Sequence, residues 1–155
     1  MNGLSVEAVR EDAMKELEPR LVPVRKFIKD VKESILNGVD TLDPAIIADW
    51  MFVIPVMYGE LRCLEVDCLL AAELFEGKVD KVKADSMVSK SMDQSVTEAR
   101  AMAAQATHDL QVQQQVAKFM ARTVNALWSQ LEMLIFSVRA LYESRQSNHK
   151  VKHEV

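Results

Sequence analysis

Basic side chains gather at two places in the sequence, and their spacing suits the binding of phosphate groups. Seven of them form these two groups: Arg25, Lys29 and Lys32, and then Lys78, Lys81, Lys83 and Lys90. Several basic residues on one short element attract a polyanion without reading its sequence. The same spacing is also typical of solvated charges and of partners for acidic residues elsewhere in the chain. Both interpretations stay open at this stage.

No other group of residues has the spacing of a catalytic or metal-binding motif. The sequence lacks a glycine-rich phosphate loop and a serine in a glycine-flanked turn. His149 and His153 have the i, i+4 spacing of a metal pair, but only Glu154 is near them as a third ligand. The carboxylates between Glu60 and Glu76 have no matching Glu-x-x-His sequence on another helix. We therefore expect no enzyme activity, no cofactor and no metal.

The composition indicates that helices position these residues. The chain has 155 residues, of which 49% are apolar, with only four Gly and four Pro. Such a chain fits one domain, and residues 1–155 are predicted to form a single all-α domain. Cys63 and Cys68 lie five apart and point in different directions from one helix, so they suit neither a disulfide nor a zinc site.

The compartment is predicted from what the sequence lacks. The N-terminus has neither the basic start nor the apolar core of a signal peptide. The longest apolar run is about fourteen residues and includes Asp49, which is short of the roughly 20 residues that span a bilayer. We expect a cytoplasmic protein with no membrane partner.

Apolar residues at steps of three and four predict an elongated helical bundle. Residues 1–37 are expected to hold two short N-terminal helices, because Pro19 and Pro23 interrupt the pattern. Residues 43–76 and 95–145 are expected to form a long antiparallel, coiled-coil-like hairpin. The lysine-rich segment between them loses the period and is predicted to be a loop, and residues 146–155 a disordered polar tail.

The second long helix carries two apolar stripes, and only one of them is needed for the hairpin. At about 1.5 Å per residue this helix is longer than a compact domain of this size. Either the N-terminal helices cover the second stripe, which would make a monomeric four-helix bundle, or another subunit does. Because the N-terminal helices look short, we favour a homo-oligomer. The expected interface residues are Val116, Phe119, Trp128, Met133 and Phe136.

The order of these parts resembles a known family. An apolar helix with Trp50 ("DWMFVIPVMYGELRCLEVDCLLAAELFEG") precedes a basic connector ("KVDKVKADSMVSKSM"). The segment "TEARAMA" then opens a long helix that ends in "LWSQLEMLIFSVRALYES". Over roughly residues 46–145 this order resembles the UvsY-like family of phage recombination mediators.

The resemblance implies a function. It implies a ring of helical subunits that binds single-stranded DNA weakly and without sequence preference. Such a ring helps to load a recombinase onto strands covered by single-strand-binding protein, in the host cytoplasm if the chain is phage-encoded. Lys78, Lys81 and Lys83 would then contact DNA. The alternative is a structural or adaptor helical oligomer that binds only protein partners.

Overall fold

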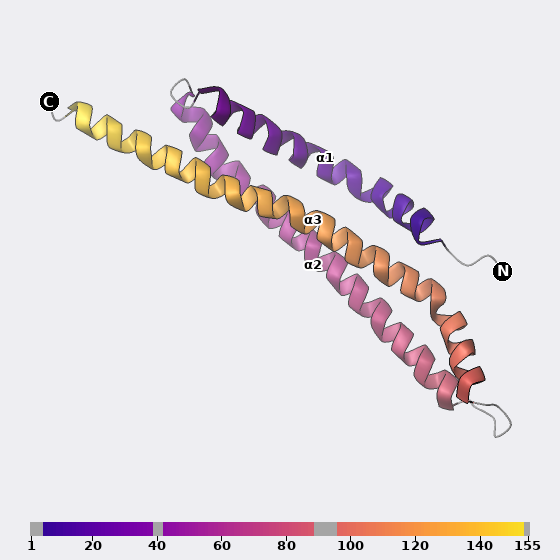
Figure 1. The fold of residues 1–155 in the computed structure, drawn as a ribbon. Coiled ribbons are helices and arrows are strands. Elements are labelled where there is room, and N and C mark those ends of the chain that lie inside the picture. Colours follow the sequence, from indigo (N-terminus) through magenta and orange to yellow (C-terminus); the bar gives the residue numbers. More distant parts are fainter. Residues whose placement is uncertain (1–4, 39–41, 89–95, 154–155) are drawn as a thin grey trace. The chain divides into compact units, whose positions relative to one another are not determined.

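The computed structural model describes residues 5–38, 42–88 and 96–153, with side chains up to residue 147. Three helices fill these ranges: α1 (Val6–Gly38), α2 (Pro44–Val88) and α3 (Val96–His153) (Figure 1). Within these ranges there is no strand, so the predicted all-α class is confirmed. Helix α3 continues past the predicted end at 145 to His153.

The prediction of two short N-terminal helices is wrong, because α1 is one helix of 33 residues with Pro19 and Pro23 inside it. A proline removes one backbone hydrogen bond and crowds the carbonyl one turn earlier. Both prolines are exposed, so water can reach the carbonyls that they leave without a donor. On the opposite side Leu17, Leu21 and Val24 are buried in steps of four and three. Burial of this stripe holds the helix together through both prolines.

The predicted loop after Gly77 is also wrong, because α2 continues to Val88. Ala72 and Val79 are buried, while Phe75 and Val82 are half-buried, so the inward stripe keeps its steps of three and four past the glycine. Glycine in a helix interior costs only about 1 kcal/mol relative to alanine, which this burial offsets. The lysines of the predicted loop that the structure describes therefore lie on a helix.

The helix ends follow local signals that the sequence shows. The Asp43 carboxylate accepts a hydrogen bond from the Ala45 amide at 2.9 Å, and Pro44 occupies the first helical position, as predicted. Gly38 ends α1 with a φ of 149°, a conformation that side-chain-bearing residues rarely adopt. The predicted cap at Ser95 lies outside the described residues.

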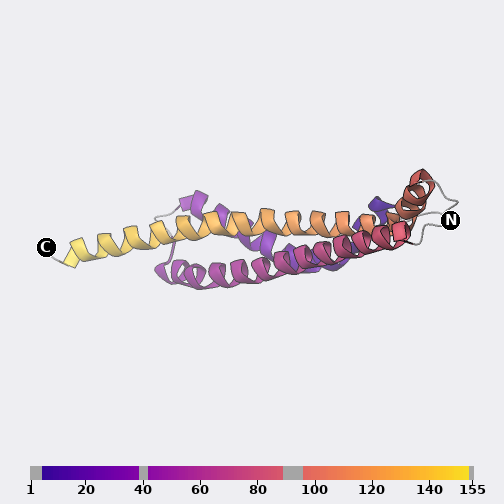
Figure 2. The same ribbon diagram turned by 90° about the horizontal axis from the view of Figure 1, so that it is seen from below.

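The three helices, seen from two directions in Figures 1 and 2, divide into two compact units, and each helix contributes to both. The first unit comprises residues 1–17 and 65–122, and the second comprises residues 18–64 and 123–155. In the second unit the core includes the fully buried side chains of Leu21, Val31, Ile47, Ile54, Leu131 and Val138.

The core of the first unit contains smaller side chains. It includes Ala72, Ala99, Ala103, Val112 and Val116. Thr107 is fully buried here, while the neighbouring Ala106 is exposed. The Thr107 hydroxyl donates to the Ala103 carbonyl at 2.8 Å, so its burial leaves no hydroxyl without a partner.

Candidate functional site

Trp128, one of the five predicted interface residues, packs on α2 of its own chain. In the second unit its ring lies at 89° to that of Tyr58, with ring centroids 5.5 Å apart. The Arg62 guanidinium carbon lies 4.4 Å from the Trp128 ring centroid. An edge-on aromatic pair and a stacked arginine both favour this geometry. Trp128 is half-buried, and through these contacts it helps to pack α2 against α3.

The first part of the predicted second stripe is covered by residues of its own chain. Val112 and Val116 are buried in the first unit, and Phe119 is half-buried. The Arg10 guanidinium lies 3.7 Å from the centroid of the Phe119 ring. The predicted interface residue Val116 is therefore buried inside its own chain, and Arg10 of α1 contacts the neighbouring Phe119.

Met133 and Phe136 remain exposed on α3, at 70% and 65%. Met133 lines a groove of about 570 Å³ in the second unit, between α1 and α3. The groove has apolar side chains from both helices: Ile35, Leu36, Met133 and Leu134. Leu36 on its rim is 82% exposed. Met133 and Phe136 are thus the uncovered part of the predicted second stripe, and Ile35 and Leu36 of α1 form the opposite wall of the groove.

A second apolar face lies on α2 and was not predicted. In the second unit Phe52 is 76% exposed and Val56 is 50% exposed. Gly59 and Cys63 continue this face in steps of three and four, and both are exposed. We call these four residues the α2 face. Asp49 and Glu60 are also exposed, and both lie along the same side of this stripe around the helix. They give the α2 face an acidic edge.

Helix α2 is also apolar on its exposed side in the first unit. Val66, Leu69, Leu70 and Leu74 are all more than two-fifths exposed there. Sequence reasoning assigned α2 a single buried stripe and looked for a second stripe only on the last helix. Steps of three and four from Phe52 to Cys63 and from Val66 to Leu70 were the signal that could have revealed the outer apolar residues.

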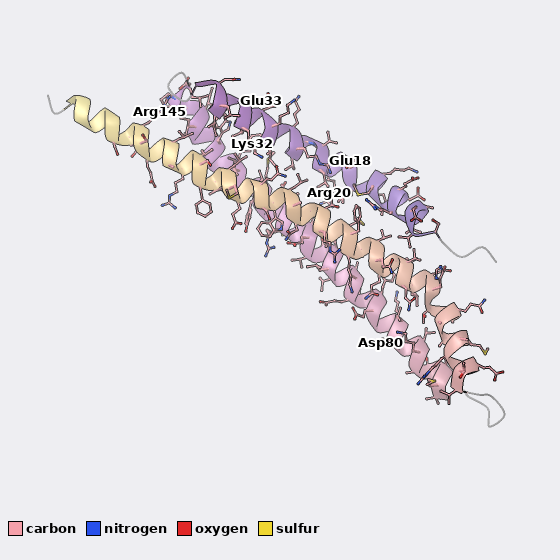
Figure 3. All side chains as sticks on the ribbon, viewed as in Figure 1. Glu18, Arg20, Lys32, Glu33, Asp80 and Arg145 are labelled. Atoms are coloured by element: carbon pink, nitrogen blue, oxygen red, sulfur yellow. The ribbon has the colours of Figure 1, made fainter. Side chains whose placement is uncertain are left out.

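The first basic group lies along α1 in the second unit, and two of its three members have acidic partners. Arg25 forms an ion pair with Glu18, and the Lys29 ammonium lies 3.7 Å from the Glu33 carboxylate. Lys32 donates a hydrogen bond to the neutral side-chain amide of Gln130, at 3.1 Å. Figure 3 labels Glu18, Lys32 and Glu33 along α1. Lys32 thus has no acidic partner among the described residues, and it lies in the wall of the groove.

The second basic group lies on α2 in the first unit. Lys78, Lys81 and Lys83 are exposed, and the Lys78 ammonium lies 5.4 Å from the centroid of the Phe75 ring. Acidic residues alternate with the lysines: Glu76, Asp80 and Asp85. Glu76 accepts a hydrogen bond from Gln114 at 2.8 Å and lies 3.5 Å from the Lys118 ammonium. The segment is therefore close to electrically neutral, and Lys90 lies outside the described residues.

The described part of the chain has no metal site, but one of its helices is apolar enough to cross a membrane. Among the described side chains, no three His, Cys, Asp or Glu residues are grouped to hold a metal ion; His149 and His153 lie beyond them. Helix α2 is long and apolar enough to cross a membrane, and only 17% of its most apolar window is buried. Core helices of non-membrane proteins also meet that criterion, so the expectation of no membrane partner stays a prediction.

No protein-family model, curated protein or solved structure matches this chain significantly. The function is therefore inferred from the chemistry of the surfaces described above.

Proposed function

We propose that the protein is a non-enzymatic helical adaptor that acts as a homo-oligomer in the cytoplasm. One observation carries the proposal: the α2 face, with Phe52 and Val56 exposed at 76% and 50%. Apolar surface in water costs roughly 25 cal/mol per Å², and contiguous exposed patches mark interaction sites in folded proteins. The exposed Met133 and Phe136 on α3 support the same conclusion.

The proposal includes the finer architecture expected from the sequence. Helices α2 and α3 form an elongated, antiparallel, coiled-coil-like hairpin, to which α1 adds a third helix. The Tyr58–Trp128 contact supports the pairing of α2 with α3. Such a scaffold presents side chains on rigid helices, which suits a protein that brings partners together.

Light scattering on a variant of the α2 face tests the proposal. Phe52→Glu places a charge on the face without altering the core, since Phe52 is exposed. We expect the wild-type chain to have a mass that is a multiple of 17.5 kDa, and the variant to have a smaller one. Gln105→Glu is the matched control, because it adds one negative charge at an exposed position of α3. An unchanged mass in Phe52→Glu, with helicity intact, would remove the α2 face from the proposal.

A second candidate function is more specific. The lysines of α2 and the resemblance to recombination mediators suggest a protein that binds single-stranded DNA and helps to load a recombinase. The exposed Lys81 and Lys83 support DNA binding, because neither forms an ion pair with a described residue. The neighbouring Glu76, Asp80 and Asp85 reduce the local positive potential. DNA binding would then be weak for each copy and would depend on repetition of the site around an oligomer.

A further inference from the structure

The groove between α1 and α3 has the character of a docking site for a helix. Its volume is about 570 Å³, and its floor and walls are mostly apolar. Leu134 is buried and Ile35 is half-buried, while Leu36 of α1 and Met133 of α3 are exposed at 82% and 70%. A groove with apolar walls from two helices accepts the apolar side of an amphipathic third helix.

One charge in the lining indicates the chemistry of the occupant. Among the described residues, Lys32 is the one charged residue that lines the groove, and its only partner is the neutral amide of Gln130. Lys29, three residues earlier on α1, is 72% exposed and has Glu33 at 3.7 Å. A helix that fits here should therefore have an apolar stripe with a carboxylate beside it.

The chain carries such a helix itself. The α2 face presents Phe52, Val56 and Cys63 at helical spacing, and Asp49 and Glu60 form its acidic edge. Both the face and the groove lie in the second unit, on different helices, so one copy can offer both at once. A pocket of about 360 Å³ between α2 and α3 offers no comparable match, because its Arg139 already pairs with Glu143 at 3.0 Å.

We propose that the α2 face of a second copy docks in this groove, with its acidic edge against Lys32. The inference rests on the proposed homo-oligomer and specifies how the oligomer is built. Because the groove and the face are different surfaces, the contact is heterologous and repeats from copy to copy. Such contacts close into rings or extend into filaments.

The charges favour this contact over a pair of identical faces. In a two-fold antiparallel pair of α2 faces, the same edge of each helix meets its own copy. Asp49 and Glu60 of one copy would then meet the same carboxylates of the other, and like charges in contact disfavour association. Against the groove, the same carboxylates meet Lys32.

A charge-swap mixing experiment tests the inference. One variant is Lys32→Glu, which makes the groove acidic; the other is Asp49→Lys with Glu60→Lys, which makes the edge of the face basic. Alone, each variant brings like charges together, and we expect its self-dissociation constant to rise by about tenfold or more. Mixed in equal amounts, the two variants have complementary contacts in both directions, so assembly should return. Lys26→Glu is the matched control, because it makes the same charge change on α1 away from the groove.

The outcomes separate this inference from the proposed function. If the wild-type chain is an oligomer and Lys32→Glu does not dissociate it, the groove contact is wrong while the homo-oligomer stands. The same conclusion follows if the mixture of the two variants fails to reassemble. A monomeric wild-type chain would overturn both. A wild-type chain that is monomeric but floats with phosphatidylcholine vesicles would assign the α2 face to a lipid surface, against both proposals. Circular dichroism confirms that each variant is folded, and Lys32→Gln repeats the test without adding a charge.

Discussion

The rings of Tyr58 and Trp128 lie at right angles, with their centroids 5.5 Å apart. This contact joins α2 to α3 in the second unit, and Arg62 stacks on the same indole ring at 4.4 Å. Tyr58 and Arg62 thus turn one side of α2 toward α3. Phe52 and Val56 lie on another side of the helix and remain exposed. The internal packing of α2 therefore determines which apolar residues are left for a partner.

Replacement of the tryptophan should weaken the second unit. We expect Trp128→Ala to lower the free energy of unfolding by about 2 kcal/mol, less than for a fully buried aromatic residue because Trp128 is half-buried. Urea unfolding followed by circular dichroism measures it. In a double-mutant cycle with Tyr58→Ala, the coupling energy should be about 0.5–1.5 kcal/mol. Strictly additive effects would show that the ring pair contributes nothing of its own.

The same substitution at two neighbouring residues of α3 should change stability by very different amounts. Leu134 is 4% exposed, and Leu134→Asp should lower the free energy of unfolding by several kcal/mol, because it buries a carboxylate. Met133 is 70% exposed, so Met133→Asp should change it by about 0.5 kcal/mol or less when both chains are compared as monomers. Thermal and urea unfolding of the two variants compare them directly. Equal losses would mean that the faces of α3 are assigned incorrectly.

Replacement of Pro19 tests whether α1 is one helix, because the free energy of unfolding should rise in one case and fall in the other. Pro19→Ala in a continuous helix restores a backbone hydrogen bond, and we expect it to raise the free energy of unfolding by on the order of 2 kcal/mol. If the helix ended before Pro19, the same change would only loosen the unfolded chain and lower that free energy by roughly 0.4–1 kcal/mol. Denaturant titration of the variant beside the wild-type chain distinguishes the two signs.

Gly77→Ala tests the extension of α2. A Cβ atom at this position would have no neighbour within 4 Å, so alanine fits without a clash. In a helix interior the substitution should raise the free energy of unfolding by about 0.5–1 kcal/mol. It should also slow amide hydrogen exchange in residues 78–88. Unchanged exchange there would point to a loop, as the sequence suggested.

Three kinds of feature could be predicted from the sequence. The all-α class followed from composition, and the start of α2 followed from Asp43 and Pro44. The end of α1 followed from Gly38. These signals are local, because a capping carboxylate or a glycine acts within one helical turn.

The continuous helices could not be predicted, because they depend on burial. Pro19, Pro23 and Gly77 break or weaken a helix in isolation, yet the buried stripes on the opposite sides of α1 and α2 outweigh them. The same limit applies to the candidate site. Periodicity shows that Phe52 and Phe136 lie on apolar stripes, but only the packed structure shows that no described residue of the chain covers them.

Charge reversal separates DNA binding from a role restricted to protein partners. Lys78→Glu, Lys81→Glu and Lys83→Glu together replace three exposed positive charges on α2. If the chain binds single-stranded DNA, filter binding should show retention at low salt that falls steeply as salt rises, and the triple variant should lose it. Oligomer mass should not change, because these lysines are distant in sequence from the α2 face. Equal retention by the triple variant and the wild-type chain would exclude these lysines as the contact.

The proposal as a whole depends on whether copies of this chain associate through exposed apolar side chains. Sedimentation equilibrium of the unmodified chain over a range of concentrations measures this most directly. We predict a mass that is a multiple of 17.5 kDa and that falls toward this value only on dilution. A mass of 17.5 kDa at every concentration would contradict the homo-oligomer and the docking of α2 in the groove.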